Sequence, residues 1–587
     1  MCIRDRNYFL IGVFALVVMM FAACSNEDKP GEERSNGNGN TEVVEGEPTW
    51  AKFTFKLGKD GAVSRTTGET HEGTTAEKNI KNLRAYIFNE SGNFEAKTEG
   101  ATVDAHNTEH TAVLKLTSGK KKVYVAANMQ DEWITSTTTT AQFEAVILTH
   151  CTTAGRIAHT KGTDKADAAE RVGDFDKISG NKNADTNGFL MANVLATTEY
   201  TLYPGVSAEN CSKPSYSSPE EMAKNNHLEV SISRAAAKLQ ATYADADALT
   251  LKDNASKPLG KLLTPTFTVR NLPVQSYMFL HNQANGFLTP FYTMTNTSST
   301  FNDFAKYYDE ANKPDLTLKA SSDGDAQSIY LPENSNQTPV RGNTTYVLVK
   351  GVFAPADNVM INKVEVEGEG ENLTIKNTLD NTDYTGGGTN VPAFFIVPEW
   401  ENQIYTAPAG TTPSELASYG LAMILKTYLS KAGKQKWLKA VDPTTAENEG
   451  DVSNPVSVYY TCKLTPAEGI YSMVTIEKNA QPKNGSGYLA STESQIRILQ
   501  YVDGTCYYRV NVEDNMDGKT EANNLFYSVM RNRFYNVNIS RITSIGYPSD
   551  EDVTVDPTDP INQKTYMQAH ITVEPWTKVE QDAELGM

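Results

Sequence analysis

The chain near its carboxyl end reads Val529-Met530-Arg531-Asn532-Arg533-Phe534-Tyr535-Asn536-Val537-Asn538-Ile539-Ser540. Its apolar side chains fall at every second position in Tyr535, Val537 and Ile539, which is the period of a strand with one buried face. The same period returns in residues 567–573, just before Trp576. These two stretches predict two strands separated by a Pro- and Asp-rich break.

The last residues after Trp576 alternate more sharply. One face carries the charged side chains of Lys578, Glu580, Asp582 and Glu584. The other face carries Val579, Ala583 and Leu585, with Gln581 as the one interruption. A strand with one apolar face needs that face covered. Because no later segment of this sequence supplies a cover, we expect another copy of the chain to do so.

Length and composition limit the class of protein. A chain of 587 residues predicts two or three domains with linkers. Hydrophobic residues at 39%, charged residues at 21% and 28 tyrosines are typical of a soluble, strand-rich protein. A net charge of -19 argues against nucleic acid as a partner, since that binding depends on neutralising phosphates with Lys and Arg.

The amino terminus has the features of an export signal. Arg4 and Arg6 precede an apolar run over residues 8–21, which is too short to span a bilayer. The sequence Phe21-Ala22-Ala23-Cys24 resembles a bacterial lipobox, in which the chain is cut before Cys24 and its thiol carries the lipid. An ordinary secretory signal cut after a site of the Ala-x-Ala kind is the alternative. We prefer the lipobox because polar residues follow the cysteine at once.

A flexible tether and a first strand follow the signal. Residues 25–40 are rich in Glu, Asn, Gly and Ser and cannot bury apolar area. Residues 50–57 then alternate as a strand whose inward side chains are Ala51, Phe53, Phe55 and Leu57. Small and polar residues make 62–68 a loop, and exposed loops of this composition are where proteases cut.

The remaining pattern is mostly β. Strands are predicted at 83–88, 112–116, 123–127, 228–234, 237–243, 266–270 and 341–353, the last four belonging to a second set. Residues 143–187 leave room for a short helix, 188–191 return to the sheet, and 211–226 form a candidate domain boundary. One amphipathic helix is predicted after Thr412-Pro413-Ser414-Glu415, ending at Gly433. Short strands with few helices favour β-sandwiches.

Residues with catalytic or metal-binding chemistry form no convincing site. His106 and His110 have helical metal-ligand spacing, but the residues between them read as a turn beside a strand. Residues 514–521 fail the calcium-loop pattern and read as a hairpin turn, and the Gly-rich 368–373 and 386–388 lack a phosphate-loop context. We therefore predict no catalytic residues, no metal and no cofactor. Four cysteines, Cys151, Cys211, Cys462 and Cys506, either pair within domains as 151–211 and 462–506 or remain buried free thiols.

Three ordered motifs resemble the signatures of fimbrillins. They are Arg341-Gly342-Asn343-Thr344-Thr345-Tyr346-Val347-Leu348-Val349, Val529 to Tyr535 with Ile542-Thr543-Ser544-Ile545-Gly546, and Val573-Glu574-Pro575-Trp576. Together with the lipobox they are similar to the minor-fimbrium shaft subunits of type V pili. The resemblance implies two stacked transthyretin-like β-sandwiches with a C-terminal donor strand, exported as a lipoprotein to the outer membrane.

The resemblance also implies an assembly route. An arginine-specific protease cuts the loop after the first strand, and Arg65, followed by Thr66, matches that position. Cutting there removes Cys24 with its lipid and the first strand, which opens a groove for a neighbour's tail. Val579, Ala583 and Leu585 then replace the lost side chains, with Trp576 as anchor, contributing roughly 5 to 10 kcal/mol before ordering costs. The alternatives are a solvated loop arginine and a tail that docks on its own domain.

The expected organisation is a signal peptide at 1–23, a lipidated propeptide at 24–65, sandwiches at 66–226 and 227–564, and a donor segment at 565–587. Expected partners are further copies of the chain in an adhesive extracellular fimbrium, tip and anchor subunits, and the processing protease. A monomeric surface lipoprotein that binds glycans or host proteins, a tip or anchor subunit, and an enzyme assembled from distant residues are the competing hypotheses. A mature chain that keeps Cys24 is expected of the monomeric lipoprotein.

Overall fold

A computed structural model of the chain describes residues 43–57, 71–149, 189–293, 304–305, 316–406, 439–501, 503–550 and 558–577, with gaps inside several of these ranges. The chain divides into two compact units, residues 1–42 and Val43–Met587, and all described residues belong to the second. Within them, no helix has the length and apolar character needed to cross a membrane.

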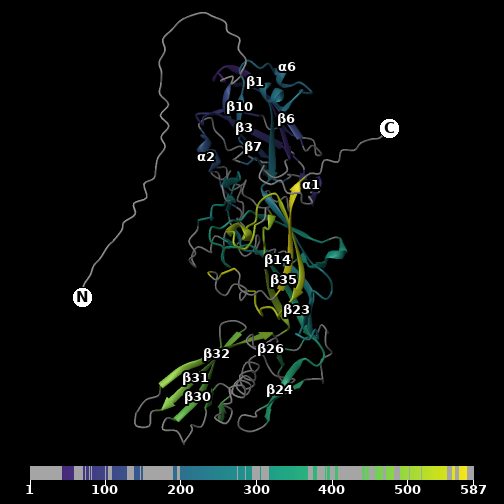
Figure 1. The fold of residues 1–587 in the computed structure, drawn as a ribbon, viewed down its shortest axis with the longest axis vertical. Coiled ribbons are helices and arrows are strands. Elements are labelled where there is room, and N and C mark those ends of the chain that lie inside the picture. Colours follow the sequence, from purple (N-terminus) through teal and green to yellow (C-terminus); the bar gives the residue numbers. More distant parts are fainter. Residues whose placement is uncertain are drawn as a thin grey trace, which may run out of the picture. The chain divides into compact units, whose positions relative to one another are not determined.

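The first sheet has nine strands and contains the amino-terminal strand β1 (Figure 1). Its order is β4 (Phe94–Lys97), β3 (Asn82–Asn89), β7 (Gly119–Ala127), β9 (Met191–Ala192), β11 (His227–Arg234), β1 (Pro48–Leu57) and β6 (Glu109–Thr117). In addition, β10 (Glu199–Leu202) pairs with β7, and β5 (Ala101–Thr102) pairs with β3. One apolar core takes side chains from β1, β3, β7, β9 and β11, so the sheet encloses a core of its own.

Two further sheets pack face to face. The second contains β2 (His71–Glu72), β35 (Met567–Thr577), β34 (Arg533–Ile542), β12 (Ala236–Tyr243) and β21 (Lys319–Ala320), with β22 (Ser328–Pro332) on β12. The third contains β13 (Thr250–Lys252), β14 (Pro258–Arg270), β23 (Tyr346–Pro355) and β33 (Thr505–Asn511), with β20 (Leu316–Thr317) on β14. A single core draws on both sheets, for example Val537 of β34 and Val349 of β23, so the pair is a β-sandwich.

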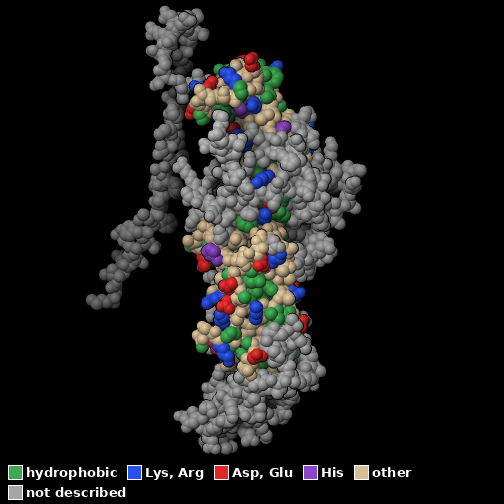
Figure 2. All heavy atoms as spheres, turned by 90° about the vertical axis from the view of Figure 1, so that its right-hand side faces the viewer, with side chains coloured by type: hydrophobic (Ala, Val, Ile, Leu, Met, Phe, Trp, Pro, Cys, Tyr) green, Lys and Arg blue, Asp and Glu red, His purple; other side chains and the backbone are tan. Residues whose placement is uncertain are grey.

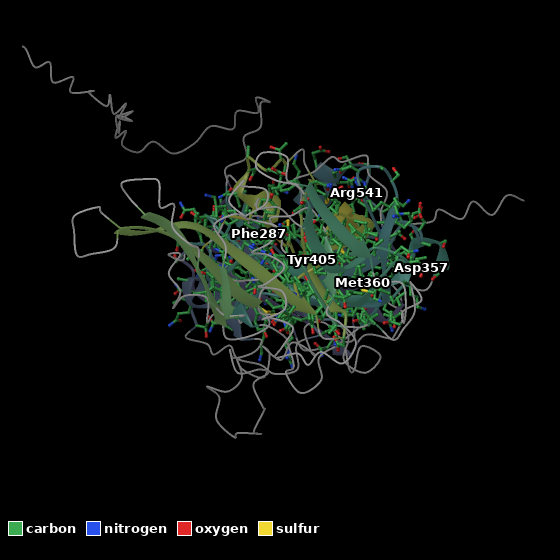
Figure 3. All side chains as sticks on the ribbon, turned by 90° about the horizontal axis from the view of Figure 1, so that it is seen from below. Phe287, Asp357, Met360, Tyr405 and Arg541 are labelled. Atoms are coloured by element: carbon green, nitrogen blue, oxygen red, sulfur yellow. The ribbon has the colours of Figure 1, made fainter. Side chains whose placement is uncertain are left out.

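The part of the chain between β23 and β33 forms a fourth sheet. Its order is β25 (Thr374–Leu379), β24 (Met360–Glu367), β27 (Ile404–Thr406), β26 (Phe394–Ile396), β32 (Leu489–Tyr501), β31 (Tyr471–Gln481), β30 (Ser457–Pro466), β29 (Thr445–Glu447) and β28 (Lys439–Asp442). Met360 of β24 and Tyr405 of β27 lie on neighbouring strands (Figure 3). Tyr405 stacks on Phe395 with ring centroids 5.2 Å apart, which fixes this junction.

Short elements complete the described chain. Three two-stranded sheets pair β15 (Leu272–Pro273) with β19 (Phe304–Ala305), β16 (Gln275–Tyr277) with β8 (Ile147–Thr149), and β17 (His281–Gln283) with β18 (Gly286–Leu288). The described helices are α1 (Thr75–Lys78), α2 (Thr140–Glu144), α6 (Ala208–Cys211), α7 (Pro219–Lys224), and the 3-10 turns η3 (Ser321–Asp323) and η6 (Asn524–Tyr527). Thr139 and Gln142 form a capping box at α2, and Ser218 caps α7 just before Pro219.

The mainly β fold class is confirmed, as are the strands predicted in the described residues, except that residues 341–345 of the stretch 341–353 form a turn before β23. Two interpretations were wrong. The strand at 228–234 is β11 of the first sheet rather than the first strand of the second set, because it pairs with β1 and β9. The segment at 514–521 is no hairpin, because β33 and β34, which flank it, lie in different sheets. The helix predicted at 412–433 and the Gly-rich stretches at 368–373 and 386–388 lie outside the described residues, and the domain limits remain a prediction.

Candidate assembly site

Strand β1 lies between β6 and β11, two strands that do not pair with each other. It runs parallel to β11, from the pair Lys52 and His227 to the pair Leu57 and Ile232. It runs antiparallel to β6, which among the described strands pairs with β1 alone. Removing β1 would therefore expose a hydrogen-bonding edge on each side of a slot one strand wide.

The inward face of β1 fills the core of the first sheet. Ala51, Phe53 and Phe55 are fully buried, and Leu57 is 8% exposed, as the alternation predicts. The rings of Phe53 and Phe55 stack with centroids 6.1 Å apart, and Phe55 also stacks on His110 of β6 at 6.4 Å. Burial lowers the pKa of His110, so this ring favours the neutral form. His110 thus lies on a strand and packs against β1.

The outward face of β1 carries the half-exposed Trp50, Lys52 and Lys56 together with the buried Thr54. Lys56 Nζ lies 2.7 Å from Glu229 Oε1, and the Thr54 hydroxyl lies 2.8 Å from His227 Nε2. Both contacts cross to β11 diagonally, each reaching the residue two positions before the one directly opposite. Figure 2 shows acidic and basic side chains mixed over the described part of one face of the molecule. A strand in this slot is therefore held by apolar side chains inward and small polar contacts outward.

The amino end of β1 sits in a buried polar pocket. Thr49 is 1% exposed and Asn226 is fully buried, with Asn226 in the left-handed backbone region at φ 52°. The Asn226 amide donates to Thr49 Oγ1 at 2.9 Å and to the Trp50 carbonyl at 3.1 Å. The Thr49 hydroxyl donates in turn to the Tyr203 carbonyl at 2.8 Å. These contacts fix where β1 begins.

Strand β35 leads into the tail. It pairs antiparallel with β34, with Tyr535 opposite Val573 and Arg533 opposite Pro575. On its other side, the short β2 pairs with its last two residues, His71 opposite Trp576 and Glu72 opposite Thr577. The segment that follows the predicted cleavage loop therefore lies beside the point where the tail begins.

Buried ion pairs surround the turn before β34. Arg531 makes a two-pronged pair with Glu333, with both N–O distances 2.6 Å, and also donates to the carbonyls of Met278 and Tyr277. Arg533 pairs with the fully buried Asp514. Both arginines are nearly fully buried, so the acids supply the charge that makes their burial tolerable.

Asn532, between these arginines, connects the turn to the first sheet. Its φ is 58°, a region that Asn tolerates better than most residues. Its side-chain oxygen accepts from Arg234 at 3.0 Å, and Arg234 also donates to the backbone carbonyl of Glu77 at 2.7 Å. The Glu77 carboxylate accepts from Tyr330 at 2.6 Å and pairs with Lys238 at 3.0 Å. Sequence reasoning missed Glu77 and Glu333, because a buried acid reads like any other acid in so acidic a chain.

Buried hydrogen bonds also hold the segment around Arg341 in place. The Asn343 side chain accepts from the Val340 amide at 2.8 Å and donates to the Thr338 carbonyl at 3.0 Å. The Arg341 carbonyl accepts from Arg509 at 2.9 Å, and the Arg509 guanidinium lies 4.0 Å from the centre of the Tyr346 ring. Burial lowers the pKa of Arg509 to about 9, so it keeps its charge at neutral pH.

Two family models match the chain at its two ends. The model described as "Major fimbrial subunit protein (FimA)" matches residues 51–234, and that described as "Major fimbrial subunit protein type IV, Fimbrillin, C-terminal" matches residues 499–582. Both ends of the chain are therefore similar to fimbrillins. Fimbrillins are subunits of cell-surface fimbriae, and the first match covers β1 to β11 while the second covers β33 to β35.

Three solved structures are similar to this chain at low sequence identity. A fimbrilin from Porphyromonas gingivalis is 13% identical over 91% of this chain and 99% of its own, with a TM-score of 0.38. A putative cell adhesion protein from Parabacteroides distasonis is 12% identical over 91% and 100%, with a TM-score of 0.36. The tip fimbrial protein Mfa3 from Porphyromonas gingivalis is 10% identical over 57% and 100%, with a TM-score of 0.29. A search of curated protein sequences finds no match.

Several of the predicted site residues lie outside the described residues. They are Cys24, Arg65, Thr66, Val579, Ala583 and Leu585, together with the side chain of Trp576. Within the described part, no three His, Cys, Asp or Glu side chains approach closely enough to hold a metal. Cys211 and Cys506 are buried free thiols. The described assembly site therefore consists of β1, its slot and the base of the tail.

Proposed function

We propose that this chain is a fimbrillin shaft subunit that polymerises when its first strand is replaced by the tail of a neighbour. The observation that carries the proposal is the position of β1. It is buried along its inner face, it separates β6 from β11, and it precedes the loop that contains Arg65. A single cut in that loop disconnects β1 from every later strand.

The energetics favour exchange over a permanently open slot. Phe53, Phe55 and Leu57 are each worth about 1.5 to 3 kcal/mol of burial, which keeps the uncut precursor closed. Once β1 is no longer linked to the rest, its departure exposes two strand edges and an apolar groove. Such a groove is a template for an added strand, with main-chain hydrogen bonds for affinity and side-chain pockets for specificity.

The neighbour's tail supplies the replacement in this scheme. Residues 577–585 alternate charged and mostly apolar side chains, which suits a slot that is apolar inside and polar outside. The donor tail and the acceptor slot are different surfaces of the chain. Contacts of this kind do not close into a dimer, so they generate a filament.

Export and processing complete the proposal. Lipid on Cys24 would hold the precursor at the outer membrane until an arginine-specific protease cuts between Arg65 and Thr66. The cut would release the subunit from its lipid and open its slot in one step. Growth of the fimbrium outside the cell, with tip and anchor subunits at its ends and a role in adhesion, follows from this role.

Two variants test the proposal. Deleting residues 577–587 should abolish filaments after arginine-specific proteolysis, as seen by electron microscopy, because the donor is gone. Replacing Arg65→Ala should leave a lipidated monomer. Filaments of wild-type length from the truncated chain would refute the donor assignment, and processed filaments from the Ala variant would refute the cleavage site.

The amino-terminal residue of surface-exposed protein separates the shaft from the monomeric adhesin. Thr66 is expected for a processed shaft subunit. Cys24 at the start of the mature surface chain would instead support a lipoprotein that stays anchored and binds its ligands alone.

A further inference from the structure

The polar pocket at the amino end of β1 has a geometry that selects what enters the slot. We infer that Tyr203, Val206 and Asn226 set the register and direction of the incoming strand by requiring a hydroxyl where Thr49 now lies, and that Thr577 supplies it. This inference rests on the proposed function and specifies how the donor is recognised.

The hydroxyl of Thr49 makes three contacts in that pocket. It donates to the Tyr203 carbonyl at 2.8 Å, and it accepts from the Val206 amide at 3.1 Å and from the Asn226 side chain at 2.9 Å. An aliphatic side chain at this position would remove the acceptor of the Val206 amide, while the Tyr203 carbonyl would keep only its contact with the Asn226 side chain at 2.8 Å. A buried amide is costly to leave unsatisfied once a strand seals it from water.

The adjacent backbone contacts give the pocket a direction. Trp50 donates its amide to the Val206 carbonyl at 2.9 Å, and Lys52 donates its amide to the Asn226 carbonyl at 2.9 Å. Asn226 is itself held by Tyr203, whose amide donates to the Asn226 side-chain oxygen at 2.7 Å. A strand therefore needs its hydroxyl first and its apolar side chains after it, in the direction of β1.

The apolar part of the slot begins two residues later. Thr49, Ala51, Phe53, Phe55 and Leu57 all lie on the inward face, at a spacing of two. A donor strand that fits the slot therefore has a hydroxyl side chain first, followed by an apolar side chain at every second residue. A strand in the reverse direction would bring its hydroxyl to the opposite, apolar end beside Ile232.

The tail of this chain has one register that meets the requirement. Thr577 is the single Ser or Thr in residues 577–587, and Val579 follows it by two. Aligning Thr577 with Thr49 places Val579, Gln581, Ala583 and Leu585 at the positions of Ala51, Phe53, Phe55 and Leu57. Any shift by two residues along the slot leaves the pocket without a hydroxyl. Thr577 also ends β35, so the donor starts where the subunit's own sheet stops.

Peptide binding to the cut chain tests the pocket without altering the residues that form it. The acceptor is the chain that lacks residues 577–587, cut at Arg65 and freed of the released segment, so that no tail of its own competes for the slot. The probe is a labelled peptide of residues 575–587. Thr577→Val keeps the side-chain volume and removes the hydroxyl, whereas Thr577→Ser keeps the hydroxyl. Fluorescence anisotropy should show about tenfold weaker binding for the Val peptide and near wild-type binding for the Ser peptide.

A second peptide, residues 47–57 of β1, serves as the control for the pocket itself. It should rebind the cut chain, and Thr49→Val should weaken that binding about tenfold as well. Equal binding by the wild-type peptide and its Val variant, in either the β1 or the tail series, would overturn the hydroxyl requirement. If the β1 peptide rebinds and no tail peptide does, tail donation fails, and the role of Thr577 fails with it.

Discussion

Glu513 illustrates an electrostatic cost at a single residue. It follows the end of β33, and burial, with Glu521 nearby, raises its pKa to about 6. The folded state holds this proton more tightly than the unfolded state. Protonated Glu513 therefore adds to the free energy of unfolding, and this contribution is complete below about pH 4.5. It is lost as pH rises through about 6. At neutral pH the ionised carboxylate therefore disfavours the fold.

Replacing Glu513→Gln should stabilise the protein at pH 7. A rise of about one and a half pKa units is worth about 2 kcal/mol at most, and partial exposure reduces this to about 1 kcal/mol. Urea unfolding of the variant and the wild-type chain at pH 7 and at pH 4.5 measures this gain in the free energy of unfolding. The gain should vanish at the lower pH, and a gain of the same size at both would assign it to packing instead of charge.

The pair of Arg531 and Glu333 shows the opposite case, because both partners are buried and satisfied. Glu333→Gln should lower the free energy of unfolding by about 3 to 5 kcal/mol, since it leaves the Arg531 charge without its counter-ion. Glu229→Gln breaks the exposed pair with Lys56 and is the matched control, with an expected loss below about 1 kcal/mol. Similar losses for the two variants, measured by urea unfolding, would contradict this difference in burial.

The alternation of apolar and polar side chains predicts where the strands lie, but it does not predict which strands pair with each other. The alternation in β1, β34 and β35 identifies each strand and its inward face, because the side-chain period of a strand is local. The parallel pairing of β1 with β11, and of β12 with β34, joins segments far apart in sequence, so no local pattern encodes it. This is why β11 was assigned to the wrong sheet.

The short helix α7 was missed although a local signal for it exists. Ser218 caps the helix, Pro219 occupies its first turn, and Glu221 lies three residues after the cap. The Pro- and Ser-rich composition of 211–226 indicates a domain boundary instead. The polar pocket of Asn226 was beyond prediction for another reason, since it depends on Thr49 and Tyr203 meeting across the fold.

Strand β1 should contribute to the stability of the uncut precursor and not to the stability of the filament. Phe53→Ala removes a fully buried ring and should destabilise the uncut chain by about 3 to 5 kcal/mol in urea unfolding. Urea dissociation of assembled filaments should be unchanged, because the proposed processing removes β1 from the subunit. Val125→Ala in β7 of the same core is the control and should weaken both states. Filaments weakened by Phe53→Ala would mean that β1 remains in them.

In the proposed exchange, the tail would fill the slot less fully than β1 does. In the inferred register Gln581 stands where Phe53 is buried, so the donor brings an amide to an apolar site. Gln581→Phe should therefore tighten binding of the 575–587 peptide at least tenfold, which corresponds to about 1.4 kcal/mol. Glu580→Phe adds the same ring on the charged face and should give no such gain. Equal gains from the two peptides would contradict the assigned face.

Mutations should separate the two roles of the chain, in which the tail donates a strand and the slot of β1 accepts one. A chain cut at Arg65 and lacking 577–587 keeps an open slot and has no tail to give. An uncut Arg65→Ala chain keeps its tail and has its slot closed by β1. Because each partner offers one complementary surface and the contact is heterologous, their mixture should stop at a one-to-one complex.

Light scattering after size-exclusion chromatography measures this outcome. Each variant alone should elute as a monomer, and the mixture should elute as a heterodimer without filaments. Adding Thr577→Val to the uncut partner should weaken the heterodimer about tenfold if its tail enters in the register set by the Asn226 pocket. Filaments from the mixture would require a second contact between subunits, and the absence of any complex would mean that the tail does not act in trans.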